Sequence, residues 1–117
     1  MAETTQLELV TPARVMVNKA AEMVVVPGSE GLFGVLPRHS ALLASLERGV
    51  VEVYESGKVI DRFMIDGGLA DVTPEGVTIL AERAVDLSGT TSQELKERAA
   101  NASDSEADFL NGAIEAL

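Results

Sequence analysis

Short runs in which apolar and polar residues alternate fill most of the chain. Val50–Glu55 places Val51 and Val53 on one face and Glu52 on the other, and Lys58–Asp66 alternates too, although one of its faces is mixed. Alternation with a period of two residues, rich in β-branched side chains, is typical of strands. The other strand-like runs are Gln6–Val10, Arg14–Val17, Ala20–Val26 and Val77–Ala81.

Glycine and proline separate these runs at positions that favour turns. Glu55-Ser56-Gly57-Lys58 predicts a hairpin between two strands. Thr73-Pro74-Glu75-Gly76 predicts a turn, because proline stands at its second position and glycine at its fourth. Asp66-Gly67-Gly68 predicts a bend or bulge within a strand region. Eight to ten short runs with this spacing predict an antiparallel β-sandwich.

The hydrophobic period changes to that of a helix from Leu87 onward. Thr91 and Ser103 each precede a glutamate by three residues, which is the pattern of a capping box. Apolar residues with helical spacing follow each box: Leu95, Ala99 and Ala102, then Leu110, Ile114 and Leu117. Helices this short are marginal alone in water, so we expect them to dock on another surface. The chain therefore divides into a mainly β segment, residues 1–86, and a short C-terminal helical segment, residues 87–117, formed by one helix or a helix hairpin.

Composition excludes several classes of partner and chemistry. The 117 residues suit one domain with a small appendage. A net charge of −10 opposes binding to nucleic acid or anionic lipid. The absence of cysteine and the presence of a single histidine exclude disulfides, thiolate zinc sites and multi-histidine metal sites within the chain. No apolar run approaches the roughly 20 residues that span a bilayer, so we expect no direct insertion into lipid.

Three features of the sequence suggest chemistry, and each has a simpler structural explanation. Gly28–Gly34 is rich in glycine, but it lacks the Lys-Ser/Thr of a phosphate-binding loop and favours turns between strands. His39 and Ser40 are adjacent, and neighbouring side chains of an extended segment point to opposite sides. Asp66 and Asp71 flank the glycine pair without a sign of convergence. We therefore predict no catalytic residue, no metal and no cofactor, which is the profile of an adaptor or regulator.

Several segments, in a fixed order, resemble the ε subunit of the rotary F-type ATP synthase. Val26–Leu43 contains the family's G-x-E-G-x-x-G-V/I-x-P-x-H pattern. Leu46–Val53 resembles its L-x-x-G-x-V/I-x-V/I strand, Asp66-Gly67-Gly68 its glycine pair, and Val77–Ala84 its last sandwich strand. Leu7–Pro12 and the alanine-rich tail also fit, so the resemblance covers essentially the whole chain.

The resemblance implies a ten-stranded sandwich followed by a helical tail. It also implies a non-catalytic subunit of the central stalk, which binds the γ subunit and the polar loops of the membrane c-ring and turns with them during proton-driven ATP synthesis. In many bacterial members the C-terminal helices extend along γ toward the catalytic α and β subunits and inhibit ATP hydrolysis.

Residues are carried over from the family by position in the matched segments. The residues expected to face the c-ring are Ser29, Glu30, Gly31, Leu32, Arg38 and His39. The residues expected to face γ are Leu42, Leu43, Ser45 and Val50. Many members carry an acidic residue where this chain has Leu32, which makes His39 the stronger candidate for a polar contact with the c-ring.

The tail departs from the family pattern in two ways. Some members bind ATP through an Ile/Leu-Asp-x-x-Arg-Ala motif, and here Leu95 stands where the aspartate would precede Arg98-Ala99. ATP binding is therefore not expected. Residues 87–117 carry six acidic and two basic residues, a net charge of −4, which should repel the acidic catalytic-subunit surface that inhibitory tails contact. We predict a tail that stays folded against the sandwich and inhibits weakly or not at all.

The leading hypothesis is a rotor subunit at the cytoplasmic face of the bacterial inner membrane, held there through the complex. The sequence Met1–Thr5 resembles neither a secretory signal nor a transit peptide, and the matrix of an organelle would apply if the chain were a processed form. One alternative is a free-standing β-sandwich sensor of a small ligand, with Gly28–Gly34 as its mouth. A further alternative is a hydrolase that uses His39.

Overall fold

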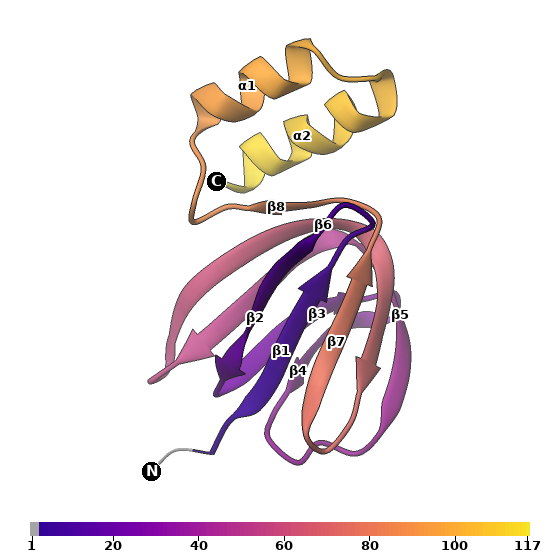
Figure 1. Ribbon diagram of the computed structural model, residues 1–117, viewed down its shortest axis with the longest axis vertical. Coiled ribbons are helices and arrows are strands. Elements are labelled where there is room, and N and C mark those ends of the chain that lie inside the picture. Colours follow the sequence, from indigo (N-terminus) through magenta and orange to yellow (C-terminus); the bar gives the residue numbers. More distant parts are fainter. Residues whose placement is uncertain (1–2) are drawn as a thin grey trace.

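The computed structural model describes residues 3–117. The predicted sandwich segment and the stretch compared with targeting signals both begin at Met1, so their first two residues, Met1 and Ala2, lie outside the described residues. Within residues 3–117 there are eight strands followed by two helices (Figure 1). The strands are β1 (Thr5–Val10), β2 (Val15–Ala21), β3 (Met23–Gly28), β4 (Gly31–Val35), β5 (Leu42–Glu55), β6 (Lys58–Val72), β7 (Gly76–Ala81) and β8 (Ala84–Asp86), and the helices are α1 (Ser92–Ala100) and α2 (Asp104–Ala116).

The strands form one continuous sheet that folds over on itself around a core. Its order is β2-β1-β7-β6-β5-β3-β4, and β8 pairs with β6 beyond the end of β7. Every pair is antiparallel except β1 with β7, which is parallel. The predicted β-sandwich with a helical tail is confirmed, and the parallel pair is the one departure from its expected antiparallel pairing.

The two central strands are longer than the sequence pattern suggests. β5 has 14 residues and β6 has 15, and the two stay paired from Leu42–Val72 to Glu55–Lys58. The core-facing side of β6 changes along its length, since Phe63 and Ile65 enter the core before the glycine pair and Ala70 and Val72 after it. Because both strands run through bends that divide their sequence into separate runs, the described chain has eight strands, within the eight to ten that the pattern predicts but fewer than the ten that the resemblance implies.

Gly67 and Gly68 make this change of side possible. Their φ angles are 73° and 141°, in the region that favours glycine. A Cβ on Gly68 would lie 2.0 Å from the carbonyl oxygen of Leu80 on the neighbouring strand. The predicted bend is therefore a position where β7 approaches too closely for any side chain.

The predicted turns also form. Ser56 and Gly57 have φ angles of 54° and 74°, the two positive values of a type I′ hairpin turn. Thr73 and Gly76 exchange backbone hydrogen bonds of 2.8 and 3.2 Å across the turn that contains Pro74. Local turn chemistry thus fixes the pairing of β5 with β6 and of β6 with β7.

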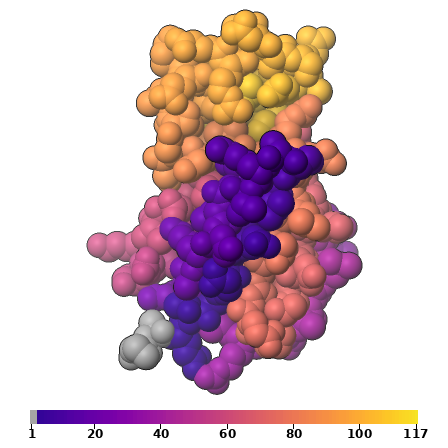
Figure 2. Space-filling view, viewed as in Figure 1, coloured from indigo at the N-terminus to yellow at the C-terminus, as the bar shows by residue number. Residues whose placement is uncertain are grey.

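The two helices form the predicted hairpin and cover one end of the sandwich (Figures 1 and 2). Thr91 and Ser103 cap them, since their hydroxyl oxygens accept from the amides of Glu94 at 3.2 Å and Glu106 at 3.4 Å. Glu94 does not complete a capping box, because its carboxylate accepts from the Thr90 hydroxyl at 3.1 Å. No helix within residues 3–117 is long and apolar enough to cross a membrane.

A second hydrophobic cluster joins the hairpin to the sandwich, apart from the main core. It consists of Met64, Val85, Leu87, Leu95, Phe109, Leu110 and Ala113. The periodicity predicted Leu95 and Leu110 correctly, but it missed Phe109, which is 1% exposed, and it included Leu117, which is 45% exposed. β6 supplies both clusters, because Phe63 and Ile65 face the main core while Met64 between them faces the hairpin.

Candidate docking surface

The tight turn between β3 and β4 carries four of the residues expected to face the c-ring. The amide and the hydroxyl of Ser29 both donate to the carbonyl oxygen of Ser45, at 2.9 and 3.0 Å, which fastens the turn to β5. A groove of about 530 Å³ lies between residues 28–33 and residues 42–45. The structure therefore brings Ser29, Glu30, Gly31 and Leu32 beside Leu42, Leu43 and Ser45, which were assigned to a different partner.

Leucines dominate the exposed part of this groove. Leu32 is 72% exposed and Leu43 is 68% exposed, on opposite walls. Glu30 is exposed at the turn and has no ion pair among those of residues 3–117. The groove is thus mainly an apolar surface with a single carboxylate at its edge.

Arg38 and His39 lie in the loop between β4 and β5 and do not line this groove. Arg38 has a φ angle of 62°, donates its amide to the carbonyl oxygen of Pro74 at 3.1 Å, and pairs with Glu3. The Nδ1 atom of His39 lies 2.8 Å from the backbone carbonyl oxygen of Ser40, not from its hydroxyl. The structure therefore shows no hydrolytic His–Ser pair at these two residues.

Val50 lies apart from the other residues assigned to γ. It is half-buried and packs against the cluster beneath the helix hairpin. β5 changes its core-facing side between Leu46 and Val51, so Val50 points away from the core on the side of the helices. Leu42, Leu43 and Ser45 therefore form one region, and Val50 belongs to another.

Sequence reasoning missed two exposed leucines that extend the surface across the sheet. Ser45 pairs with Leu69 on β6, and Leu69 pairs with Leu80 on β7. Leu80 in turn pairs with Val10 on β1. Leu69 and Leu80 are 42% and 50% exposed, and they line a second groove of about 560 Å³ together with Val10 and Pro12. A count of alternation from Phe63 would have placed Leu69 inside, because the glycine bend reverses the pattern.

Four exposed leucines form one outer surface, which we call the leucine face: Leu69 and Leu80 on neighbouring strands, Leu43 on β5, and Leu32 across the first groove. Buried partners alternate with it along each strand, since Ala70, Ile79 and Ala81 lie in the core. Exposed contiguous apolar side chains on a sheet are typical of a surface that a partner covers. The leucine face is therefore the strongest candidate for a docking site in the described chain.

Asp66 and Asp71 do not converge on a common site. Asp66 accepts hydrogen bonds from Arg48 Nε at 2.9 Å and from Arg83 Nη1 at 3.0 Å. Burial by itself raises the pKa of Asp66, but the hydrogen bonds from the two arginines outweigh it and hold this pKa below its usual value. Asp71 is exposed on the outer surface beside Leu43. Residues 3–117 contain no group of three or more His, Cys, Asp or Glu placed to hold a metal ion.

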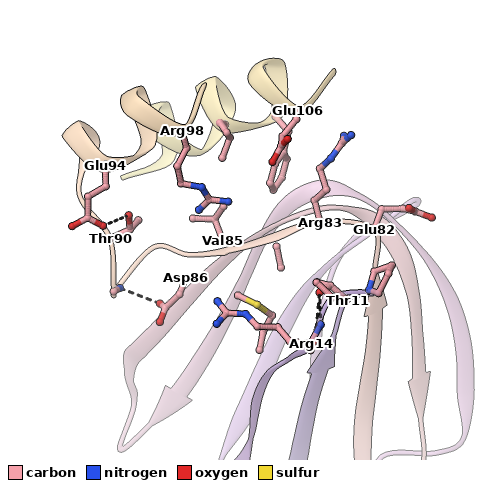
Figure 3. Close-up of a pocket in the computed structure, with 17 residues that line it drawn as sticks. Thr11, Arg14, Glu82, Arg83, Val85, Asp86, Thr90, Glu94, Arg98 and Glu106 are labelled. Carbon is pink, nitrogen blue, oxygen red and sulfur yellow. Dashed lines mark hydrogen bonds between the residues drawn. The ribbon is translucent and has the colours of Figure 1, made fainter. Parts of the chain in front are cut away.

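A cleft of about 440 Å³ lies on one side of the contact between the helix hairpin and the sandwich (Figure 3). Arg98 enters it from α1 and Arg14 from the β1–β2 turn, with Glu94, Asp86 and Glu82 around them. Leu95, at the position of the aspartate in the ATP-binding motif of some ε subunits, is fully buried at 0% exposure. The tail therefore presents no carboxylate at that position.

Comparison with known proteins agrees with this fold. Residues 4–87 match the family described as "ATP synthase, Delta/Epsilon chain, beta-sandwich domain". The chain is 44% identical to the ATP synthase epsilon chain of Rhodospirillum rubrum over 104 residues, which cover 89% of this chain and 78% of that one. It is 46% identical to the epsilon chain of Hyphomonas neptunium over 95 residues, or 81% of this chain and 70% of that one.

Two solved structures share the architecture. A chain of the Euglena gracilis mitochondrial ATP synthase superposes with a TM-score of 0.67 at 24% identity, covering 96% of this chain and 76% of that one. A chain from the central stalk and c-ring of the Tetrahymena thermophila mitochondrial ATP synthase gives 0.61 at 16% identity, covering 74% and 69%. The fold is thus that of the β-sandwich subunits of ATP synthases. With the family match and the curated relatives, the chain belongs to the ATP synthase epsilon chain family.

Proposed function

We propose that the chain is a non-catalytic rotor subunit that couples rotation of the γ subunit to the membrane c-ring during proton-driven ATP synthesis. The catalytic sites then lie on other subunits of the complex. Family membership supports this proposal, and so do the two similar structures: one is of the OSCP, F1 and c-ring of an ATP synthase, and the other is of the central stalk and c-ring of another. As part of such a complex, the chain is peripheral to the cytoplasmic face of the bacterial inner membrane.

The leucine face is the observation that carries the proposal. A subunit that turns with a shaft needs a stable interface, usually of at least about 1,200 Å² with an apolar centre. Leu32, Leu43, Leu69 and Leu80 supply such a centre on the outside of the sheet. We assign γ to this face, with Leu42 and Ser45 at its margin. Val50 is left out of the contact, because it packs beneath the hairpin.

The loops beside the leucine face are assigned to the c-ring. Ser29, Glu30 and Gly31 form the exposed turn that is fastened to Ser45. Arg38 and His39 lie in the loop that leads into β5. These polar residues suit contact with the polar loops of the ring, whereas Leu32, first expected on the c-ring side, is assigned to γ with the rest of the leucine face.

The helix hairpin is proposed to remain on the sandwich and to inhibit ATP hydrolysis at most weakly. Phe109, Leu110 and Ala113 are each no more than 1% exposed, so releasing α2 would expose a buried apolar surface. The net charge of −4 on residues 87–117 also disfavours contact with acidic catalytic subunits. Removing residues 88–117 should leave hydrolysis by the assembled complex unchanged, and a several-fold rise would contradict this part of the proposal.

The main test uses the leucine face in the assembled complex. The double variant Leu69→Ser, Leu80→Ser should lose at least about tenfold in affinity for γ, because two apolar contacts near the centre of an interface are removed. The matched control is Val59→Ser, Ile60→Ser, since these residues are 38% and 39% exposed beside the β5–β6 turn. Co-purification of γ in equal amounts with both double variants would overturn the assignment.

A free-standing sensor of small ligands remains the alternative. The groove at Gly28–Phe33 has about 530 Å³, within the usual range for small-molecule sites. This reading requires the isolated chain to bind a ligand there and to show no affinity for γ. Calorimetry with a panel of nucleotides and metabolites, run beside the γ co-purification, separates the two functions.

A further inference from the structure

The arginines of the sandwich are distributed unevenly. Residues 1–86 contain five arginines. Arg48, Arg62 and Arg83 bond to α2, and Arg14 lines the cleft beneath the hairpin. Only Arg38 lies elsewhere, paired with Glu3. The sandwich thus directs four of its five arginines, though not Lys19 or Lys58, toward a hairpin segment whose own net charge is −4.

Asp66 connects two of these arginines to each other. It accepts from Arg48 Nε at 2.9 Å and from Arg83 Nη1 at 3.0 Å. Each arginine then uses another nitrogen to reach α2: Arg48 Nη1 donates to Asp108 at 2.8 Å, and Arg83 Nη2 donates to the Ser105 hydroxyl at 3.1 Å. One carboxylate of the sheet therefore orients two guanidinium groups that both hold the first half of the helix.

The same contacts cover the edge of the apolar cluster. The guanidinium of Arg48 lies 5.6 Å from the centre of the Phe109 ring, within the range of a cation–π contact. At the other end of α2, Arg62 Nη2 donates to the carbonyl oxygen of Ala116 at 2.7 Å, where the helix has free carbonyl groups and a negative dipole end. Among the described residues, α1 makes no side-chain hydrogen bond to the sandwich, so α2 carries the polar attachment of the hairpin.

Exposure decides how strong this attachment can be. The Asp108 side chain is 76% exposed and that of Arg48 is 38% exposed, and an isolated surface pair of this kind contributes little. The Asp66 side chain is only 18% exposed, and it makes the pair part of a network. The network therefore has its most exposed pair at the helix, through Asp108, and its least exposed carboxylate, Asp66, in the sheet.

We propose that Arg48, Asp66, Arg83 and Asp108 form an electrostatic latch that sets how often the helix hairpin leaves the sandwich. Opening breaks the bonds to Asp108 and Ser105 and uncovers Phe109, while the sheet keeps the Asp66 pairs. The linker pivots after Gly89, since the Leu87 amide donates to the Arg62 carbonyl at 2.8 Å, the Ser88 hydroxyl accepts from the Arg62 amide at 3.2 Å, and the Gly89 amide donates to the Asp86 carboxylate at 3.1 Å. This inference deepens the proposed docked hairpin and does not depend on γ or the c-ring.

Hydrogen exchange on the isolated full-length chain tests the latch. In Arg48→Ala, the amides of α2 should exchange roughly three- to tenfold faster, because one hydrogen-bonded charge pair to the helix and the cover of Phe109 are lost. Amides of β1 and β7 should not change. Arg38→Ala is the matched control, because it removes an arginine from the sandwich that has no contact with the hairpin.

Asp108→Asn tests the contribution of the ion pair without changing the packing of the apolar cluster. This side chain is exposed and lies outside the apolar cluster, so the substitution leaves the core intact. It should accelerate exchange of α2 by a smaller factor, about two- to fourfold. Raising the salt concentration from about 0.1 M to about 1 M shortens the screening length from about 10 Å to about 3 Å, and should speed exchange in the wild type more than in the Arg48→Ala, Asp108→Asn double variant.

Two results would overturn the latch. One is exchange of α2 in Arg48→Ala and Asp108→Asn that matches the Arg38→Ala control. The other is faster exchange spread equally over the sheet and the helices, which would mean that Arg48 stabilises the whole fold. Neither result bears on γ binding, which is tested separately at Leu69 and Leu80.

Discussion

The sheet presents two apolar outer surfaces, and the chain treats them differently. On one, Met64 and Val85 are covered by Phe109 and Leu110 of the hairpin, with arginines at the edge. On the other, Leu43, Leu69 and Leu80 are left open. β6 contributes to both, on either side of its glycine pair. The chain thus covers one apolar surface with its own helices and leaves the other exposed, and the exposed one is where we propose that γ binds.

The largest loss of stability is expected from Gly68→Ala, which should disturb the sheet beneath both the covered and the open surface. A Cβ there would lie 2.0 Å from the Leu80 carbonyl oxygen, and the φ angle of 141° is strained for alanine. We expect a loss of at least about 4 kcal/mol in the free energy of unfolding, measured by urea denaturation. Gly31→Ala is the control, because its φ angle is 126° but no atom lies within 4 Å of a Cβ. Equal losses in the two variants would show that backbone strain, and not the contact with β7, decides the stability.

Phe109→Ala should release the helix hairpin from the covered surface while the sandwich stays folded. Removing a fully buried phenylalanine usually costs about 3–5 kcal/mol, and here the cavity lies between α2 and β6. We expect the hairpin to detach and become sensitive to protease, while the sandwich keeps its strand signal in circular dichroism. Loss of the attached hairpin and of the strand signal in a single transition would mean that the hairpin and the sandwich fold as one cooperative unit.

Acid should reduce the stability that Asp66 gives to the region of the covered surface, and it should not act on the open leucine face. The pKa of Asp66 is below its ordinary value of 3.8, so the carboxylate stabilises the folded state at neutral pH. This contribution is retained above pH 4 and lost as the pH falls through the lowered pKa. The difference in unfolding free energy between the wild type and Asp66→Asn should therefore be constant between about pH 7 and pH 5 and shrink below about pH 4. A difference that stays constant down to pH 2 would contradict the ionic role of Asp66.

The smallest effect is expected on the open surface. Leu80→Ser should change the free energy of unfolding by less than about 1 kcal/mol, because half of this side chain is already exposed to water. Thermal denaturation of the isolated chain measures it. A larger loss would mean that Leu80 supports the sheet itself, and the γ assignment would lose its main argument.

Local signals in the sequence predicted the elements well. The Ser56-Gly57 turn, the Pro74 turn and the helix caps at Thr91 and Ser103 depend on residues a few positions apart, so they can be identified without the fold. The resemblance to the ε family likewise depended on ordered motifs, and the family is confirmed.

Features that depend on distant residues were missed. Leu69 points outward because the bend at Gly67 and Gly68 reverses the alternation of β6. Leu80 follows the regular alternation of β7, but only the pairing of β7 with β6 places it beside Leu69. Phe109 is buried because β6 and β8 lie beneath α2, and Val50 was grouped with Leu43 although β5 turns it toward the helices. The pairing of β1 with β7 joins segments from the two ends of the sandwich, and no local pattern marks it.

The long β5–β6 ribbon has a mechanical consequence. Its ladder continues from Leu42 beside the leucine face to Arg48 beneath α2 and on to the Glu55–Lys58 end. A pull along these strands loads many backbone hydrogen bonds in shear together, whereas a pull across them would unzip the bonds one at a time. A twisting shaft seated on the leucine face would load this ribbon first, so single-molecule stretching along it should meet more resistance than stretching between the ends of the helix hairpin.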